Sequence, residues 1–244
     1  MHVAAGGEGA LQRVHTTPAM ARANYDSLAS YYDIWSSYEA PHVEAGIEAL
    51  GLKVGELVLE LGCGTGKAAV QLAEAVQPGG RYVGLDISDG MLAKARARLE
   101  SAGLASCSTV AVADATQPFP SLSNGSEPLT QEPPGKAPVM ADAIFLSFTL
   151  ELIDTPQIPV VLGSCHAALR AGGRLVLVCM SKGRGRGGMA LRMYEWAHDA
   201  FPRTVDCRPI EPAPLLKAAG FTVGRVEERS VYGLPVDVVV AEKP

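Results

Sequence analysis

Three alternating glycines and two acidic residues stand at a spacing that suits ligand binding. Gly62, Gly64 and Gly66 fall within one turn. Glu60 precedes that turn, and Asp86 lies 20 residues after Gly66. A glycine-rich turn between a strand and a helix exposes bare backbone and a helix N-terminus to a ligand. An acid that ends the next strand can accept hydrogen bonds from both hydroxyls of a ribose. The spacing therefore indicates a site for a ligand that contains a ribose.

Two phosphate-binding motifs are close to this turn but differ from it in register. A Walker A loop would require glycine at Leu61 and serine or threonine at Ala68. A dinucleotide motif in the same register would require its third glycine at Lys67. Starting that motif at Gly64 places Ala69 last, which is tolerated, but it moves the turn one residue into the helix. An NAD-dependent Rossmann oxidoreductase therefore stays open as an alternative.

The acid before the turn favours a different class of ligand. A carboxylate at Glu60 attracts a cation and would repel phosphates at short range. The segment Glu60–Gly66 resembles the first motif of class I methyltransferases, Glu/Asp-x-Gly-x-Gly-x-Gly, residue for residue. The resemblance implies S-adenosylmethionine as the cofactor, which carries a sulfonium and an ammonium and no pyrophosphate. The product would be S-adenosylhomocysteine.

The segments around the turn alternate between the patterns of strands and helices. The expected strands are residues 56–61, 81–86, 108–112, 141–147 and 174–180, and the expected helices between them are residues 67–76, 88–101 and 156–169. Such alternation predicts a parallel sheet with helices on both faces. Two further strands, at residues 221–227 and 236–241, are separated by a stretch too short for a helical crossover. These two must therefore pair antiparallel.

The length of 244 residues fits one domain. We expect a flexible N-terminus over residues 1–23 and a single domain over residues 24–244, which opens with two helices, the second starting near Pro41. Residues 118–138 are rich in Pro, Ser, Gly and Glu and have no apolar period, so we expect an irregular insertion there. Residues 181–212 interrupt the alternation and are expected to lie on the substrate side.

Composition and charge argue against several other classes of protein. The net charge of -5, from 21 basic and 26 acidic residues, is untypical of a general nucleic-acid binder. The five cysteines form no Cys-x-x-Cys pair, so no metal site is expected, and free thiols suggest the cytoplasm or an organelle matrix. No segment reaches the roughly 20 apolar residues of a transmembrane helix, while peripheral membrane contact stays open. The sequence indicates no particular oligomeric state.

The likeness to class I methyltransferases extends from about Tyr25 to Lys243. Within that class the chain resembles the group that includes ubiquinone/menaquinone biosynthesis methyltransferases. The likeness rests on the Tyr-Asp helix motif at residues 25–33 and on four later segments, at residues 83–92, 113–115, 142–148 and 169–175. The family fold implies a Rossmann-like α/β protein with a seven-stranded, mostly parallel sheet. Its last strand is antiparallel, and helices cover both faces.

The resemblance also assigns residues to the cofactor. These are Tyr25, Tyr32, Glu60, Gly62, Gly64, Gly66, Asp86, Ile87, Met91, Asp114, Ala115 and Ser147. It implies that the glycines make room for the amino-acid part and that the acid ending the second strand holds the ribose. Ile87 and Met91 would pack on the adenine, whose edge Asp114 and Ala115 would read. Ser147 would lie beside the methionine moiety.

Each of these residues also has a purely structural interpretation. The resemblance implies that Tyr25 and Tyr32 cover the methyl end of the cofactor, but aromatic residues on an amphipathic helix usually belong to a core. Asp114 could be a turn residue. Asp86 could cap the following helix, and the glycines could serve the turn alone.

The sequence gives weaker signals for the residues that would bind the methyl acceptor. A base is needed only if the acceptor must lose a proton, and the candidates are Glu151, Asp154, His198 and Asp206. An amphipathic helix at residues 189–201 could form an apolar acceptor pocket, a lipid-facing lid or a helix packed on the sheet. Its apolar residues are Met189, Met193, Tyr194, Trp196, Ala197 and Phe201.

A basic loop precedes that helix, with Lys182, Arg184 and Arg186, and it is either an anion-attracting edge or a solvated loop. The asparagine-rich stretch of the quinone enzymes is absent at residues 148–152. We therefore expect methyl transfer to a small, apolar or lipid-like metabolite, of which a quinone precursor is one type. The alternatives are an NAD-dependent oxidoreductase and a methyltransferase-like protein that binds the cofactor without turnover.

Overall fold

The computed structural model describes residues 17–28, 36–120, 140–183, 188–200 and 207–244. Several residues singled out from the sequence lie outside these ranges. They are Tyr32, Arg184, Arg186, Phe201, Asp206 and most of the expected insertion at residues 118–138.

A seven-stranded sheet forms the centre of the molecule, in the order β3-β2-β1-β4-β5-β7-β6. Its strands are β1 (Leu57–Leu61), β2 (Arg81–Asp86), β3 (Ser108–Val112), β4 (Ala141–Ser147), β5 (Leu169–Met180), β6 (Thr222–Val231) and β7 (Leu234–Glu242). The first five strands pair in parallel, and β7 is antiparallel to both β5 and β6. The predicted fold class is thus confirmed.

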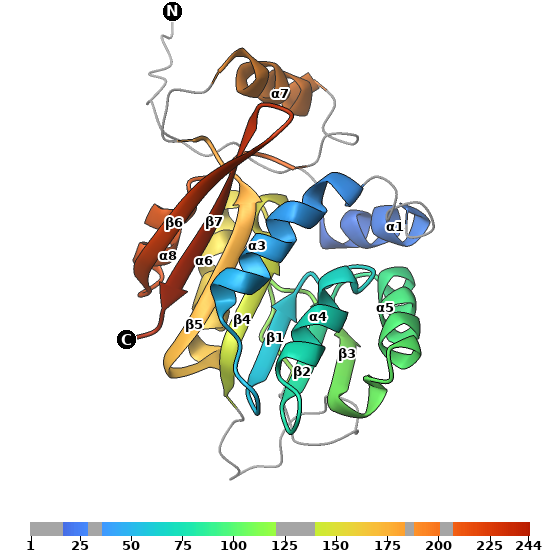
Figure 1. Ribbon diagram of the computed structural model, residues 1–244. Coiled ribbons are helices and arrows are strands. Elements are labelled where there is room, and N and C mark those ends of the chain that lie inside the picture. Colours follow the sequence, from blue (N-terminus) through green and yellow to red (C-terminus); the bar gives the residue numbers. More distant parts are fainter. Residues whose placement is uncertain (1–16, 29–35, 121–139, 184–187, 201–206) are drawn as a thin grey trace, which may run out of the picture.

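Helices cover both faces of the sheet (Figure 1). The α-helices of the described residues are α1 (Pro18–Leu28), α3 (Ala40–Leu50), α4 (Lys67–Ala75), α5 (Asp89–Ser101), α6 (Ile158–Ala168), α7 (Met189–Ala200) and α8 (Pro212–Ala218), of which α7 does not cover the sheet. Neighbouring residues of β1 enter opposite cores, because successive strand side chains point to opposite faces. Leu59 packs in the core shared with α6 and α8, and Val58 packs in the core shared with α3 and α4. All of β1 is buried, as expected for a central parallel strand.

The first helix begins earlier than expected. Helix α1 starts at Pro18, so the predicted flexible terminus at residues 1–23 is wrong for its last six residues. The backbone N–H of Met20 donates to Thr17 Oγ1 at 3.3 Å, and Pro18 occupies the first helical position, where a missing N–H costs nothing. The Thr-Pro pair was the available signal for this start.

The last hairpin is longer than expected. Strands β6 and β7 are joined only by Tyr232 and Gly233, which both have positive φ. Two such residues in succession match the twist of a tight hairpin. The expected strands at residues 221–227 and 236–241 were too short at the hairpin end, and for β6 the reason is that it is an edge strand. Charged residues on its exposed face hide the apolar alternation by which a strand is recognised.

Candidate functional site

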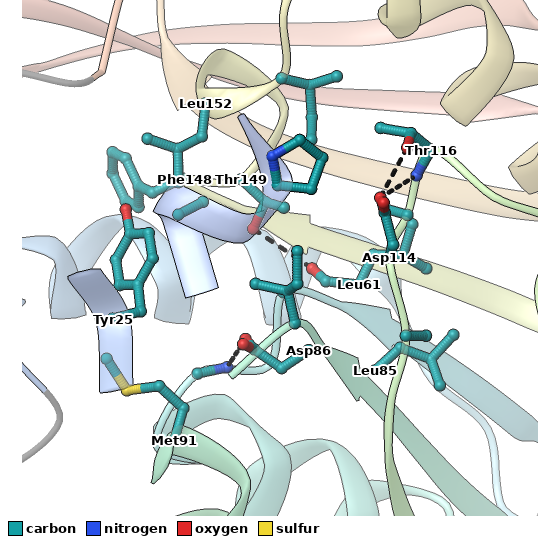
Figure 2. Close-up of a pocket in the computed structure, with 18 of the residues that line it drawn as sticks. Tyr25, Leu61, Leu85, Asp86, Met91, Asp114, Thr116, Phe148, Thr149 and Leu152 are labelled. Carbon is teal, nitrogen blue, oxygen red and sulfur yellow. Dashed lines mark hydrogen bonds between the residues drawn. The ribbon is translucent and has the colours of Figure 1, made fainter. Parts of the chain in front are cut away.

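A cavity opens at the carboxyl ends of the parallel strands, where open α/β sheets bind ligands. Helix α1, the glycine turn after β1 and the residues that follow β2, β3 and β4 line it. Of the residues assigned from the sequence, it brings together Tyr25, Gly62, Gly64, Asp86, Ile87, Met91, Asp114, Ala115 and Ser147. Figure 2 shows Tyr25 and Phe148 at one end of this cavity and Asp114 and Thr116 at the other.

Asp86 is held in place by backbone groups on two sides. Its Oδ2 accepts a hydrogen bond from Gly64 N at 2.8 Å, and its Oδ1 accepts one from Ser88 N at 2.9 Å. Burial raises the pKa of Asp86, while these backbone N–H groups lower it. Ser88, not Asp86, caps α5, because its hydroxyl accepts from Met91 N. The helix-cap interpretation of Asp86 is therefore wrong, and its carboxyl group is oriented at the cavity wall.

The three glycines of the turn meet different surroundings, although all have positive φ. A Cβ on Gly62 would overlap the side chain of Thr149. A Cβ on Gly66 would lie 2.8 Å from the backbone Cα of Ala95, so Gly66 allows α4 to pack against α5. A Cβ on Gly64 would meet no atom within 4 Å. Of the two glycines that line the cavity, Gly64 is the one whose added side chain would occupy open space.

Glu60 does not line the cavity that contains Asp86. It is buried and accepts a hydrogen bond from the Tyr82 hydroxyl at 2.6 Å. It lines a second, smaller cavity that shares Gly62, Gly64 and Ser147 with the first. Burial raises the pKa of Glu60 to about 8. Glu60 is therefore not a permanent carboxylate that attracts a cation at every pH. Its carboxyl group gains its negative charge only at high pH or beside a cation.

Asp114 is both a turn residue and a residue of the cavity wall. Its Oδ1 accepts hydrogen bonds from Thr116 N at 2.9 Å and from Thr116 Oγ1 at 2.7 Å, which is an Asx-type turn. The same residue and Ala115 line the cavity, together with Met91 on the facing helix. The turn therefore fixes Asp114 at the cavity wall.

A contact that the sequence did not reveal attaches α1 to α5. Asp26 Oδ1 accepts hydrogen bonds from Ser88 Oγ at 2.5 Å and from Gly90 N at 3.0 Å, at the N-terminus of α5. These two bonds lower the pKa of Asp26. Arg22 adds an exposed ion pair with Asp89. Since Tyr25 precedes Asp26 and lines the cavity, this contact holds α1 against it.

Replacing Asp26 by alanine is expected to raise the Kd for S-adenosylhomocysteine about 3- to 10-fold, because α1 then loses the two hydrogen bonds that hold it at the N-terminus of α5. Calorimetry would measure the change. Arg22→Ala is the matched control, and we expect it to change Kd less than 2-fold, since exposed ion pairs contribute little. Equal affinities for Asp26→Ala and the wild type would show that α1 docking does not contribute to binding.

Phe148 and Thr149 are cavity residues that the sequence did not mark. Phe148 is a buried, non-glycine residue with φ of 48°, and its N–H donates to Val178 O at 2.8 Å. Such backbone strain concentrates at functional sites. The Thr149 hydroxyl donates to Ser147 O at 2.9 Å, which places its side chain against Gly62. No local sequence pattern announces a positive φ at a phenylalanine.

Of the base candidates that the structure describes, one lies at the cavity wall. Asp154 lines the cavity, whereas Glu151 and His198 are buried and do not. His198 is thus not on the surface. Asp206 lies outside the described residues. Among the described residues, no cluster of three His, Cys, Asp or Glu could hold a metal ion.

Helix α7 does not contribute to the cavity wall. Met189, Met193 and Trp196 are exposed and line a shallow groove with Arg192. Helix α7 lies beyond the carboxyl end of β5, apart from the helices that cover the sheet (Figure 1). No helix within the described ranges is long and apolar enough to cross a membrane.

Three carboxyl groups with raised pKa make the stability of the free protein depend on pH. Burial raises the pKa of Glu39 to about 7 and those of Glu60 and Glu151 to about 8, from an ordinary 4.5. Between the ordinary pKa of 4.5 and the raised pKa values the folded state binds more protons than the unfolded state. The free energy of unfolding therefore falls as pH rises and levels off above about pH 9. We expect the free energy of unfolding in urea to be lower at pH 8 than at pH 6 by on the order of 5 kcal/mol, because Glu39 contributes about 1 kcal/mol and Glu60 and Glu151 contribute about 2 kcal/mol each.

Glu60→Gln should remove part of this dependence, because glutamine keeps the hydrogen-bonding shape without the charge. Glu100→Gln on the exposed side of α5 is the control and should leave the dependence intact. A stability that is constant or rises between pH 6 and pH 8 would contradict the assignment.

Parts of the sequence are similar to known proteins. A family model described as a methyltransferase domain matches residues 59–175. The chain is 35% identical over 89 residues to the biotin biosynthesis bifunctional protein BioHC of Teredinibacter turnerae, covering 34% of this chain and 16% of that protein. It is 28% identical over 174 residues to the ubiquinone/menaquinone biosynthesis C-methyltransferase UbiE of Methylococcus capsulatus, covering 69% of this chain and 62% of the relative. The matches span less than two thirds of either relative.

Solved structures share the fold at lower identity. Magnesium protoporphyrin IX methyltransferase from Synechocystis, with bound S-adenosylhomocysteine, is 18% identical with a TM-score of 0.67 and covers 93% of this chain and 100% of that one. The cyclase SpnF is 17% identical with a TM-score of 0.62 and covers 83% and 80%, respectively. At these identities the likeness shows the fold alone.

Proposed function

We propose that this chain is a class I methyltransferase that transfers a methyl group from S-adenosylmethionine to a small molecule, because a methyltransferase domain model matches residues 59–175 and the chain is similar to UbiE. The observation that carries the proposal is the orientation of Asp86. Backbone N–H groups of Gly64 and Ser88 hold its two oxygens at the wall of a cavity, on the strand next to the glycine turn. A carboxylate held in this way suits the two neighbouring hydroxyls of a ribose.

The order of the strands supports one orientation of the cofactor along the carboxyl edge of the sheet. Along the carboxyl edge, the strands run β3, β2, β1, β4 and β5. Asp114 follows β3, Asp86 ends β2, the glycine turn follows β1, and Ser147 ends β4. Adenine beside Asp114, ribose at Asp86 and the methionine part at the glycine turn would follow this order. The second cavity, with Glu60, extends beyond the turn and suits the ammonium group.

The residues present fit such a ligand physically. Gly64 leaves open space where a side chain would intrude, and Met91 supplies an apolar surface for a flat ring. Glu60 would ionise beside a bound ammonium group, because an opposite charge lowers the pKa that burial has raised. Bound here, S-adenosylmethionine would supply an electrophilic methyl group at the β4 end of the cavity.

The protein's part in the reaction would be alignment. Ser147, Phe148 and Leu152 form the wall at the β4 side, and Tyr25 on α1 lies over it. These residues would exclude water and hold the acceptor in line with the methyl group, an effect that can supply several kcal/mol. The largely apolar wall favours an apolar acceptor of the quinone-precursor type, for which the similarity to UbiE is a further hint.

The test is incubation of the full chain with methyl-deuterated S-adenosylmethionine and a panel of phenols, quinols and fatty acids. Mass spectrometry should find a deuterated methyl group on at least one acceptor. A second candidate function is cofactor binding without methyl transfer. It is favoured by the fold shared with SpnF, which is named as a cyclase, because one fold can carry different functions. Tight cofactor binding with no labelled product across the panel would favour that alternative.

A further inference from the structure

Helix α7 has two faces with apolar side chains, and one of them packs against the rest of the protein. Leu191, Tyr194 and His198 lie on this inner face, at helical spacing. Leu191 and His198 are buried, and the Tyr194 hydroxyl donates to Cys207 O at 3.2 Å. Helix α7 contacts β7, and Tyr194 packs against the core to which β7 contributes. The inner face thus attaches the helix to the sheet.

The outer face of α7 carries a second apolar stripe, which consists of Met189, Met193 and Trp196. These residues stand at i, i+4 and i+7, so they share one side of the helix, opposite the inner face. Their exposed fractions are 79%, 63% and 65%, respectively. Together with Arg192 they line a groove. A contiguous set of exposed apolar side chains indicates an interaction site, because its burial is favourable and the fold does not bury it.

The charge at this groove is positive. Of the four residues that line it, Arg192 is the charged one. Arg192 is exposed and has no ion pair within the described ranges, whereas Arg22, Arg174 and Arg229 pair with carboxylates. Glu195 is half-buried and does not line the groove. A cation within an apolar surface complements an anionic lipid headgroup above its acyl chains.

The hairpin of β6 and β7 adds exposed aromatic residues at the same end of the molecule. Its turn reaches towards α7 (Figure 1). Tyr232 in this turn is 86% exposed, and its ring centroid lies 6.0 Å from that of Tyr38. Tryptophan and tyrosine suit the level of lipid headgroups, because their rings are apolar and their N–H or O–H groups are polar. Two separate elements therefore present side chains of this kind.

The area of the outer face favours a lipid surface over a second protein chain. Its three apolar side chains expose roughly 400 Å² together, whereas a stable dimer buries about 800 Å² on each partner. Reversible binding to a bilayer has no such minimum area, since a few inserted side chains and a cation contribute to it directly. Helix α7 also lies beyond the carboxyl end of β5, at the edge of the sheet where the cavity opens.

We propose that the outer face of α7 binds the surface of a lipid bilayer that carries anionic headgroups. Met189, Met193 and Trp196 enter the headgroup region, and Arg192 pairs with a lipid phosphate. None of these four residues lines the cavity, so this surface is separate from the cofactor site. Together with the proposed function, the contact brings the cavity close to a phase in which apolar acceptors dissolve.

The first test uses the fluorescence of Trp196. The chain has two tryptophans, Trp35 and Trp196, so Trp35→Phe leaves Trp196 as the single indole. We expect vesicles of phosphatidylcholine and phosphatidylglycerol to shift its emission to shorter wavelength, because the ring leaves water. Lipids brominated on the acyl chain should quench this emission, since the ring would lie at the boundary between headgroups and acyl chains.

The second test measures binding of the full chain to the same vesicles by sedimentation. Met193→Asp should weaken binding about 10-fold or more, because it replaces an inserted apolar side chain by a charge. Val54→Asp is the matched control and should bind as the wild type does. Val54 is also 63% exposed, but it precedes β1 and lies at the amino edge of the sheet. Arg192→Gln should weaken binding about 5-fold at low salt, and this difference should disappear at high salt.

Urea unfolding should give midpoints near that of the wild type for Met193→Asp, Val54→Asp and Arg192→Gln, because these side chains are exposed. Wild-type protein that does not sediment with the anionic vesicles would overturn the proposal, as would equal binding by Met193→Asp. Trp196 emission that changes with protein concentration in the absence of vesicles would show contact between two copies of the chain. That result would also overturn the assignment of this face to a bilayer.

Discussion

Replacing Asp86 by alanine is expected to raise the Kd for S-adenosylhomocysteine by about 100-fold or more. The carboxylate would accept hydrogen bonds from two ribose hydroxyls, and a hydrogen bond to a charged group contributes about 1.5–3 kcal/mol. Two such bonds correspond to a factor of at least 100 in Kd. Alanine would also leave the N–H groups of Gly64 and Ser88 without their acceptor. Calorimetry with purified protein would measure the loss.

Asp114→Ala is the control for that experiment. Its Oδ1 is already engaged by Thr116, and only one edge of the adenine would depend on it. We expect its Kd to rise about 10-fold, as for a single hydrogen bond. Asp86→Ala with the affinity of the wild type would mean that the ligand does not reach β2, and would contradict the proposed orientation.

The second large effect concerns two glycines of one turn. Gly66→Ala is expected to destabilise the fold by about 2–4 kcal/mol, because its Cβ would lie 2.8 Å from the backbone of α5 at a residue with φ of 80°. Gly64→Ala meets no atom within 4 Å, so we expect only about 1 kcal/mol from its φ of 53°. Gly64→Ala should instead weaken cofactor binding, since its Cβ enters the cavity.

Urea unfolding and calorimetry on the same two variants separate these effects. Gly66→Ala should have a lowered unfolding midpoint, and Gly64→Ala should have a midpoint near that of the wild type with a Kd raised about 10-fold or more. The reverse pattern would mean that the turn is arranged differently around its ligand. Equal losses of stability would contradict the open space at Gly64.

The sequence predicted most of the sheet because its central strands carry unambiguous patterns. The expected bounds of 81–86, 108–112 and 141–147 agree with β2, β3 and β4. Buried parallel strands read as short apolar runs between glycine and proline signals, and little else competes for that pattern. The length of edge strand β6 was underestimated because Arg225, Glu227 and Arg229 form ion pairs along the strand and interrupt its apolar pattern.

The site was predictable to the extent that it depends on local motifs. Asp86 and the glycine turn act through residues close in sequence or on neighbouring strands, so spacing alone indicated them. Gly66 was assigned to the cofactor from the same motif, but its tight neighbour is Ala95 on another helix. Contacts of this kind depend on how helices pack, which spacing within one turn does not encode.

Two contacts between distant segments could not be anticipated. Asp26 contacts α5 across 62 residues of sequence, and Arg208 meets the carbonyl of Ile153 across 55. Glu60 was expected to be charged, yet burial beside Tyr82 raises its pKa to about 8. A charge state depends on the solvent around a side chain, and the sequence alone does not specify that environment.

Calorimetric titration of the wild-type chain with S-adenosylhomocysteine and, separately, with NAD tests the central claim most directly. We predict saturable, one-site binding of S-adenosylhomocysteine at micromolar concentrations, and no heat of binding with NAD at up to about a hundred times that concentration. Binding of NAD, or no binding of S-adenosylhomocysteine by folded protein, would contradict the assignment of this cavity to a methyl-donor cofactor.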